Sequence, residues 1–220
     1  MVAAERALSA AARGDDELQH ATLAGTASWV LLHQGRHADA ELVARRAAEA
    51  VQPRQMGSAP REQVTVYGAL LLSAAAPAAG EARAAAVAGY MEAAAEAAAL
   101  LPEDRHDYWV SFGPTQLAMQ RCYTSAVLGE PGAALDAAKG VRQADLLPIS
   151  WGAHHLDVAQ ACVDARKYRL ATGALLTACE VSPQWFRHQG IARGLVRQLV
   201  EHERRLSAPL KRLQVVTGVI

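Results

Sequence analysis

The sequence predicts an all-α protein, in which antiparallel helix pairs stack into a right-handed superhelix. Alanine, leucine, arginine and glutamate, the strongest helix formers, dominate a chain that is 51% hydrophobic and only 5% aromatic. No segment alternates between apolar and polar residues with the period of two that a strand requires. Clusters of glycine, proline and aspartate recur at fairly regular intervals and divide the chain into helix-length segments. With 220 residues, the chain is expected to form one domain over 1–220.

The expected helices follow from this punctuation, in chain order. Gly14 and Asp15 separate the first two helices, Gly35 and Arg36 the next two, and Pro53 and Pro60 flank a loop before the fourth. The remaining boundaries are set in the same way by later glycines, prolines and charged turns. The helices are expected at 2–13, 16–34, 37–51, 61–76, 80–101, 113–128, 131–140, 150–165, 168–180, 184–188 and 190–206. We expect no strand.

An internal repeat supports the arrangement in pairs. The segments TASWVLLHQGRHADAELVARRAAEAVQP and LDVAQACVDARKYRLATGALLTACEVSP align at their turns, and YTSAVLGEPGAALDAAKGV gives a third copy. The aligned second-helix positions hold mostly small residues, and a proline closes two of the copies: Ala40, Ala44, Ala47 and Pro53; Ala171, Leu175, Ala178 and Pro183; Ala134, Ala138 and Val141. Small residues where two helices cross, with proline ending the unit, resemble the tetratricopeptide repeat (TPR) in degenerate form. Such pairs stack, and their first helices line a concave groove.

Composition excludes several classes of function. Lysine plus arginine and aspartate plus glutamate number 22 each, so the chain lacks the positive surplus that nucleic-acid binding requires. Three well-separated cysteines, Cys122, Cys162 and Cys179, indicate neither a disulfide framework nor a zinc site. The N-terminal segment is charged throughout and has no apolar signal core, and the apolar run 64–80 is short and interrupted by Pro77. We expect a cytoplasmic protein that binds neither membrane nor cofactor.

The segment from Asp107 to Tyr123 concentrates aromatic residues in a chain that has few. Gly113 and Pro114 predict a sharp helix start, because proline at the first helical position loses no hydrogen bond. Phe112 is then placed to pack on Leu117 as a hydrophobic staple. Gln116, Gln120 and Tyr123 follow at helical spacing and form a polar stripe beside Trp109. The stripe is expected to face the groove, although Trp109 and Phe112 could equally wedge two repeats together.

Other first helices carry similar residues. Trp29 and His33 lie four residues apart, Tyr67 lies in the next first helix, and Trp151, His154 and Asp157 lie in a later one. A groove with rings and a few hydrogen-bonding groups suits a small amphipathic molecule or an extended peptide. The ligand-binding residues are therefore expected to be Trp29, His33, Tyr67, Trp109, Phe112, Gln116, Gln120, Tyr123, Trp151 and His154. No metal is expected, because the adjacent histidines His154 and His155 point about 100° apart on a helix.

Four segments carry a resemblance to a known family. YGALLLSAAA, YWVSFGPTQLAMQRCYTSAVLGEPGAAL, HHLDVAQAC and LLTACEVSPQWFRHQGIARGLVRQLV occur in the order and spacing of the C-terminal TPR-like domain of bacterial phage-repressor-like (XRE-type) helix-turn-helix regulators. The resemblance runs from about Ala10 onward. It implies a module that senses a ligand or peptide and alters contacts with a partner protein or with a second copy of itself. These regulators carry DNA-binding helices ahead of this domain, so this chain is expected to be either the sensor part of one or a stand-alone relative.

Two other functions stay open. The chain has no Gly-rich phosphate loop, no G-x-S-x-G and no H-E-x-x-H, but Tyr123, His154 and Asp157 could supply acid–base groups to a stand-alone biosynthetic enzyme, such as a cyclase acting on a natural product. A protein–protein scaffold without a small ligand is the other alternative. Aromatic side chains in the groove favour a ligand, whereas aromatic side chains at an edge favour a protein partner.

Overall fold

The computed structural model describes residues 2–11, 13–203 and 205–219 and confirms the all-α class. The helices are α1 (Val2–Ala11), α2 (Glu17–His33), α3 (His37–Ala50), α4 (Arg61–Gly80), α5 (Ala84–Ala98), α6 (Pro114–Val127), α7 (Pro131–Ala138), α8 (Pro148–Asp164), α9 (Tyr168–Val181), α10 (Pro183–His188), α11 (Gly190–His202) and α12 (Ala208–Thr217). Single 3-10 turns lie at Met56–Ser58 and Gln143–Asp145.

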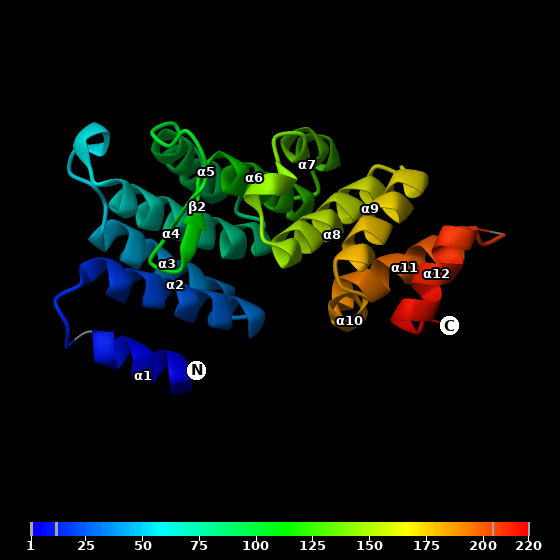
Figure 1. The fold of residues 1–220 in the computed structure, drawn as a ribbon, viewed down its shortest axis with the longest axis horizontal. Helices are drawn as coiled ribbons and strands as arrows, with labels where there is room; N and C mark the ends of the chain where they lie inside the picture. The colour runs from blue at the N-terminus through cyan, green and yellow to red at the C-terminus, as the bar shows by residue number, and fades with distance from the viewer. Residues whose placement is uncertain (1, 12, 204, 220) are drawn as a thin grey trace.

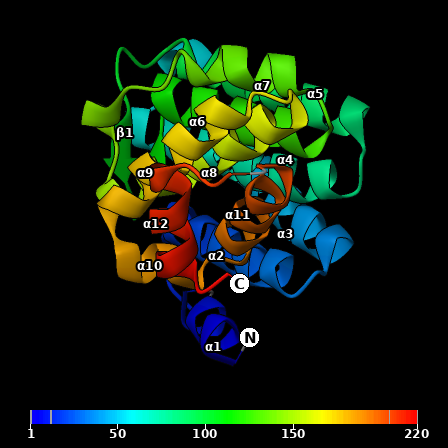
Figure 2. The same cartoon turned by 90° about the vertical axis from the view of Figure 1, so that its right-hand side faces the viewer.

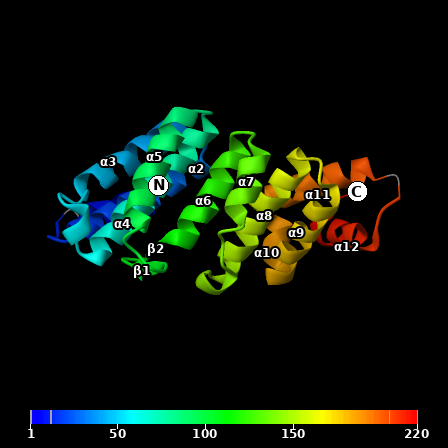
Figure 3. The same ribbon diagram turned by 90° about the horizontal axis from the view of Figure 1, so that it is seen from above.

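Consecutive helices form packed pairs. Helices α2 and α3, α4 and α5, α6 and α7, and α8 and α9 pack against one another, and the first helices α2, α4, α6 and α8 also contact in sequence. Figures 1 and 3 show these pairs following one another along the long axis, from the N-terminal to the C-terminal end. Figure 2 shows α10, α11 and α12 together at the C-terminal end of the array. The right-handed TPR-like superhelix stays a prediction.

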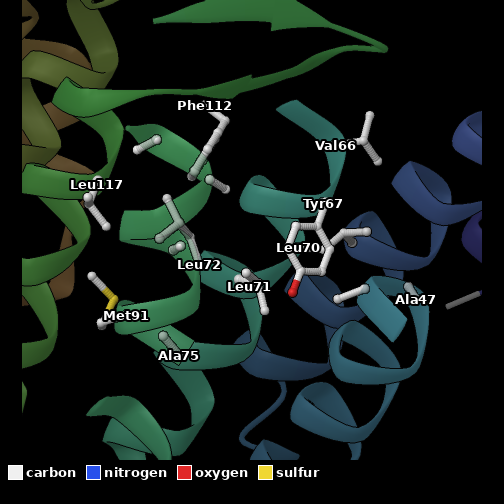
Figure 4. Close-up of a cluster of buried hydrophobic side chains, with 14 of the residues drawn as sticks. Ala47, Val66, Tyr67, Leu70, Leu71, Leu72, Ala75, Met91, Phe112 and Leu117 are labelled. Atoms are coloured by element: carbon white, nitrogen blue, oxygen red, sulfur yellow. The ribbon is translucent and has the colours of Figure 1, made fainter. Parts of the chain in front are cut away.

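The small residues of the repeat lie where helices cross. Ala40, Ala44, Ala171 and Ala178 are fully buried. Alanine lets two helix backbones approach closely, and the Ser28 hydroxyl accordingly donates a 2.8 Å hydrogen bond across the α2–α3 contact to the carbonyl of Ala40. Larger apolar residues fill the space between pairs in two main cores, one over α2 to α6 and one over α8 to α12. Figure 4 shows the first core, with the side chains of α4 at its centre.

A short β-hairpin corrects the expectation that the chain has no strand. Strands β1 (Arg105–Asp107) and β2 (Val110–Phe112) pair antiparallel, with Asp107 opposite Val110. Strands of three residues are too short to leave an alternating pattern in the sequence. The hairpin is attached to α4, because the Thr65 hydroxyl donates a 2.8 Å hydrogen bond to the Asp107 carboxylate.

Three helix boundaries also differ from the prediction. Helix α4 continues through Pro77 to Gly80, since burial of its apolar residues outweighs the one backbone hydrogen bond that proline removes. Helix α5 is shorter than the predicted 80–101, and helix α11 ends at His202, before an additional helix, α12, that the sequence did not predict. Helix α4 is long and apolar enough to cross a membrane, but 78% of its most apolar window is buried inside the protein, as in a core helix.

Helix α6 begins where the sequence predicted. Gly113 is its N-cap and Pro114 its first residue. The cap hydrogen bonds come from a residue that sequence spacing did not reveal: the Asp104 carboxylate accepts from the backbone N–H groups of Thr115 and Gln116, at 2.8 and 3.1 Å. A carboxylate at a helix N-terminus is favourable because it pairs unsatisfied N–H groups.

Candidate functional site

A groove runs across the first helices of four successive pairs. Its volume is about 730 Å³, and we call it the first-helix groove. It is lined by Ser28, Trp29, Leu32 and His33 of α2, His37 of α3, Ala69, Leu72, Ser73 and Ala76 of α4, Val110 and Ser111 of β2, Gln116, Met119, Gln120 and Tyr123 of α6, and Ala153 and Asp157 of α8. Volumes of about 300 to 1,000 Å³ are typical of small-molecule sites.

Helical spacing explains why these residues share one face. Gln116, Gln120 and Tyr123 lie three or four residues apart, and so do Ala153 and Asp157, so each set faces the same side of its helix. The polar stripe of α6 therefore lies in the groove opposite residues of α2 and α4. Of the residues singled out from sequence, the structure brings together Trp29, His33, Gln116, Gln120, Tyr123 and Asp157.

Trp29 and His33 form an aromatic pair at one side of the groove. Their ring centroids are 4.1 Å apart and the rings are tilted by 41°. His33 is held by its Nδ1, which lies 2.9 Å from the carbonyl oxygen of Trp29. Trp29 remains 60% exposed, a large fraction for a tryptophan side chain. An exposed indole beside polar groups offers a flat apolar surface to a ligand.

Gln120 and Tyr123 present polar atoms to the same space. Among the described residues, the buried Nε2 of Gln120 has no hydrogen-bond partner. Burial raises the pKa of the Tyr123 hydroxyl, and the nearby Asp157 charge raises it further, so the phenol stays protonated at neutral pH. An unpaired buried donor costs free energy, and a ligand oxygen that accepts from Gln120 would remove that cost.

Asp157 is the acidic residue of the groove. Burial raises the pKa of its carboxyl group to about 7, since a desolvated carboxylate is costly without a partner. In the part of the chain that the structure describes, its side chain makes no hydrogen bond or ion pair. The lining contains no lysine or arginine to balance it.

The other residues predicted to bind a ligand lie outside this lining. Phe112 and Tyr67 are buried in the first core, so their side chains pack against apolar neighbours, as Figure 4 shows. Trp109 lies at the tip of the β-hairpin with its side chain fully exposed, and it is not among the residues that line the groove. Phe112 therefore packs between helices, as the wedge interpretation expected, and does not line the groove.

Trp151 and His154 pack beside the groove within α8. His154 is only 2% exposed, and burial, together with neighbouring His155, lowers its pKa to about 4. Its Nδ1 has no hydrogen-bond partner among the described residues. The Trp151 ring lies 5.9 Å from that of His154 and 4.0 Å from that of His155, in an edge contact with the latter. His154 is therefore a neutral, buried imidazole at physiological pH.

Several lining residues were not singled out from sequence. His37 follows a turn, and its ring lies against Gly80, where a Cβ would come within 2.4 Å of Nδ1. Met119 lies three residues after Gln116 and four before Tyr123, on the same face of α6, whereas Ser73 of α4 lies six residues after Tyr67 and so on another face than that predicted residue. Completing the predicted α6 stripe at both i+3 and i+4 would have included Met119, but His37 and the hairpin residues enter the groove only through the tertiary fold.

Other hollows lie elsewhere along the described residues, and the following two are examples. One of about 440 Å³ lies beside α10 and α12, and one of about 800 Å³ is formed by α1, α2 and α3. Neither combines exposed aromatic rings with unpaired buried polar atoms. The described residues also contain no group of three or more histidine, cysteine, aspartate or glutamate side chains that could hold a metal ion. No protein family, curated protein or solved structure matches this chain.

Proposed function

We propose that this protein is a helical-repeat module that binds a small amphipathic molecule in the first-helix groove. The observation that carries the proposal is the composition of that groove, in which four successive first helices contribute to one cavity of about 730 Å³. The cavity combines the exposed indole of Trp29 with polar groups of Gln120, Tyr123 and Asp157. A mostly apolar site with a few convergent polar groups is typical of a small-ligand pocket.

The proposed role is regulatory. A ligand that touches α2, α4, α6 and α8 at once favours one set of angles between the helix pairs, and so shifts the population of conformations that a partner protein or a second copy of the chain recognises. The resemblance to sensor domains of transcriptional regulators supports this role. The buried free thiols Cys122, Cys162 and Cys179 favour a reducing compartment such as the cytoplasm.

Ligand screening by NMR tests the proposal. Amphipathic fragments are expected to shift the backbone resonances of the lining residues of α2, α4, α6 and α8. Gln120→Ala and Tyr123→Phe are expected to weaken binding by about 1–3 kcal/mol each, because each removes a polar group from a desolvated site. Gln160→Ala in α8 is the control and is expected to leave binding unchanged, since Gln160 does not line the groove and its side chain donates to the exposed Asp164. A screen in which no fragment shifts the lining residues would refute ligand binding here.

A second function is favoured by one observation, the carboxyl group of Asp157 with a pKa of about 7 beside the Tyr123 hydroxyl. A group that titrates near neutral pH in a groove is suited to acid–base catalysis. The alternative is therefore a stand-alone biosynthetic enzyme in which Asp157 and Tyr123 transfer protons to and from a bound natural product. His154 lies too deeply buried to contact a ligand in the groove and would at most position α8.

Mass spectrometry separates the two functions. For a binding module, ligands identified by NMR are recovered unchanged after incubation with the protein. For an enzyme, Asp157→Asn and Tyr123→Phe abolish conversion while changing affinity little, the mark of interactions made mainly in the transition state. A scaffold with no ligand gives neither shifts nor conversion.

A further inference from the structure

The charge of the first-helix groove identifies the class of ligand that it fits. Asp157 is the lining residue with an acidic side chain, and the lining contains no lysine or arginine. The other titratable groups that face this space are His33, His37 and Tyr123, and Tyr123 is a neutral phenol. On its own helix, His154 and His155 are close, and burial lowers the pKa of both, which keeps them neutral at pH 7.

We propose that the groove binds an organic ammonium ion, a primary or secondary amine on an aromatic or aliphatic body, with its nitrogen paired to Asp157. Pairing with a cation gives the half-buried carboxylate the partner that the described residues do not provide. This inference rests on the proposed function, because it names the ligand class for the same groove.

The neighbouring groups suit the rest of such a ligand. The partly exposed indole of Trp29 lies in the same cavity, on α2, and offers a flat apolar surface to the body of the ligand. The apolar body would contact Leu72, Ala76 and Met119. The unpaired Nε2 of Gln120 requires an acceptor, so a ligand oxygen near the ammonium group, as in an amino alcohol or an amino ether, would satisfy it.

An anionic ligand is disfavoured for the same reasons. It would place its charge beside the Asp157 carboxylate, and among the lining residues no guanidinium or lysine ammonium would offset the repulsion. A neutral ligand would leave the carboxylate unpaired and would gain only the apolar contacts. The groove therefore discriminates by charge as well as by shape.

Ion pairing also predicts that binding releases protons. An empty groove holds Asp157 partly protonated at pH 7, and an ammonium ligand favours its ionised form. Amine binding is then expected to release up to one proton per site below pH 7 and to weaken as the pH falls toward 5. Calorimetry in two buffers of different ionisation enthalpy measures that release.

Three probes of equal chain length test the proposal: 4-phenylbutylamine, 4-phenylbutanol and 4-phenylbutanoate. The amine is expected to bind wild-type protein at least tenfold more tightly than the alcohol, and the carboxylate more weakly than the alcohol. Asp157→Asn is expected to reduce the amine to within about twofold of the alcohol, with an unchanged affinity for the alcohol. Asp164→Asn changes the net charge equally on the exposed side of α8 and is the matched control, expected to bind like wild type.

The outcomes separate this inference from the proposed function. If the alcohol shifts the lining residues and binds as tightly as the amine, the groove binds ligands but the ammonium preference is wrong. An amine preference that persists in Asp157→Asn also overturns the inference, because the selectivity then arises elsewhere. If none of the three probes shifts the lining residues at millimolar concentration, both the inference and the proposed function fail.

Discussion

The phenyl ring of Phe112 lies directly against Gly68 of α4: a Cβ at position 68 would come within 2.2 Å of the Cε1 and Cζ atoms of the ring. Phe112 is fully buried and ends the β-hairpin immediately before α6. The missing side chain of Gly68 is therefore what allows the hairpin and the start of α6 to lie on α4. This contact positions the α6 stripe relative to α2 and α4, and so shapes the groove.

Gly68→Ala is expected to destabilise the protein by about 1–3 kcal/mol, because the added methyl group overpacks a full core. In an open helical position the same change stabilises by up to about 1 kcal/mol through helix propensity. Gly89 of α5 is the matched control, because apart from the adjacent backbone of its own helix no atom lies within 4 Å of the place that an added methyl group would take, and Gly89→Ala is expected to stabilise. Urea denaturation of both variants measures the difference. Equal effects at the two positions would contradict the role of Gly68.

Gly113 makes a second close approach. A Cβ there would come within 2.6 Å of Cα and Oδ1 of Asp104, whose carboxylate caps α6. Gly113→Val is therefore expected to cost about 1–3 kcal/mol, since the side chain would displace the cap as well as being a poor N-cap itself. Gly132→Val in α7, where the space is open, is the control. An unchanged melting temperature for Gly113→Val would mean that Asp104 does not hold the helix start.

The tip of the hairpin carries backbone strain. Tyr108 and Trp109 have positive φ angles of 49° and 65°, the signs that a two-residue type I′ turn requires. Asparagine followed by glycine adopts this turn most readily, so Tyr108→Asn with Trp109→Gly is expected to stabilise the hairpin by about 1 kcal/mol. Thermal denaturation checks the sign. A loss of stability would show that Tyr108 contributes more by packing than its backbone conformation costs.

Features of the fold that depend on residues close together in the chain could be predicted from the sequence. Helix propensity and glycine and proline punctuation predicted the all-α class, and the Gly113-Pro114 pair predicted where α6 begins. Helical spacing predicted that Gln116, Gln120 and Tyr123 share a face, and the structure places all three in the groove. These inferences need only neighbouring residues in the chain.

Contacts between distant segments could not be predicted in this way. Nothing near Phe112 in the sequence indicates that Gly68 receives its ring, and nothing near Gly113 indicates a cap from Asp104. The burial of His154 and the participation of His37 likewise depend on how pairs stack. Helical periodicity places a residue on a face but does not say whether a neighbouring helix covers it.

Asp157 and His154 are expected to give opposite dependences of stability on pH. Asp157 has its pKa raised from 3.8 to about 7 by folding, so the folded state binds more protons between these values, and the free energy of unfolding falls as the pH rises through this range. His154 has its pKa lowered from 6.5 to about 4, so the unfolded state binds more protons, and the free energy of unfolding falls as the pH drops from 6.5 to 4.

Single substitutions expose each dependence, because the two nearly cancel in the wild type between pH 4 and 6.5. Relative to wild type, Asp157→Asn is expected to gain on the order of 1–3 kcal/mol of stability between pH 4 and pH 7.5, since it removes a carboxylate that must ionise without a partner. His154→Leu is expected to gain a similar amount between pH 6.5 and pH 4, because leucine fills the same buried space and never titrates. Urea denaturation at pH 4.0, 5.5 and 7.5 measures these differences. Parallel curves for Asp157→Asn and wild type would mean that the carboxyl group titrates normally in the folded protein, and the ammonium preference of the groove would then have to rest on geometry and charge alone.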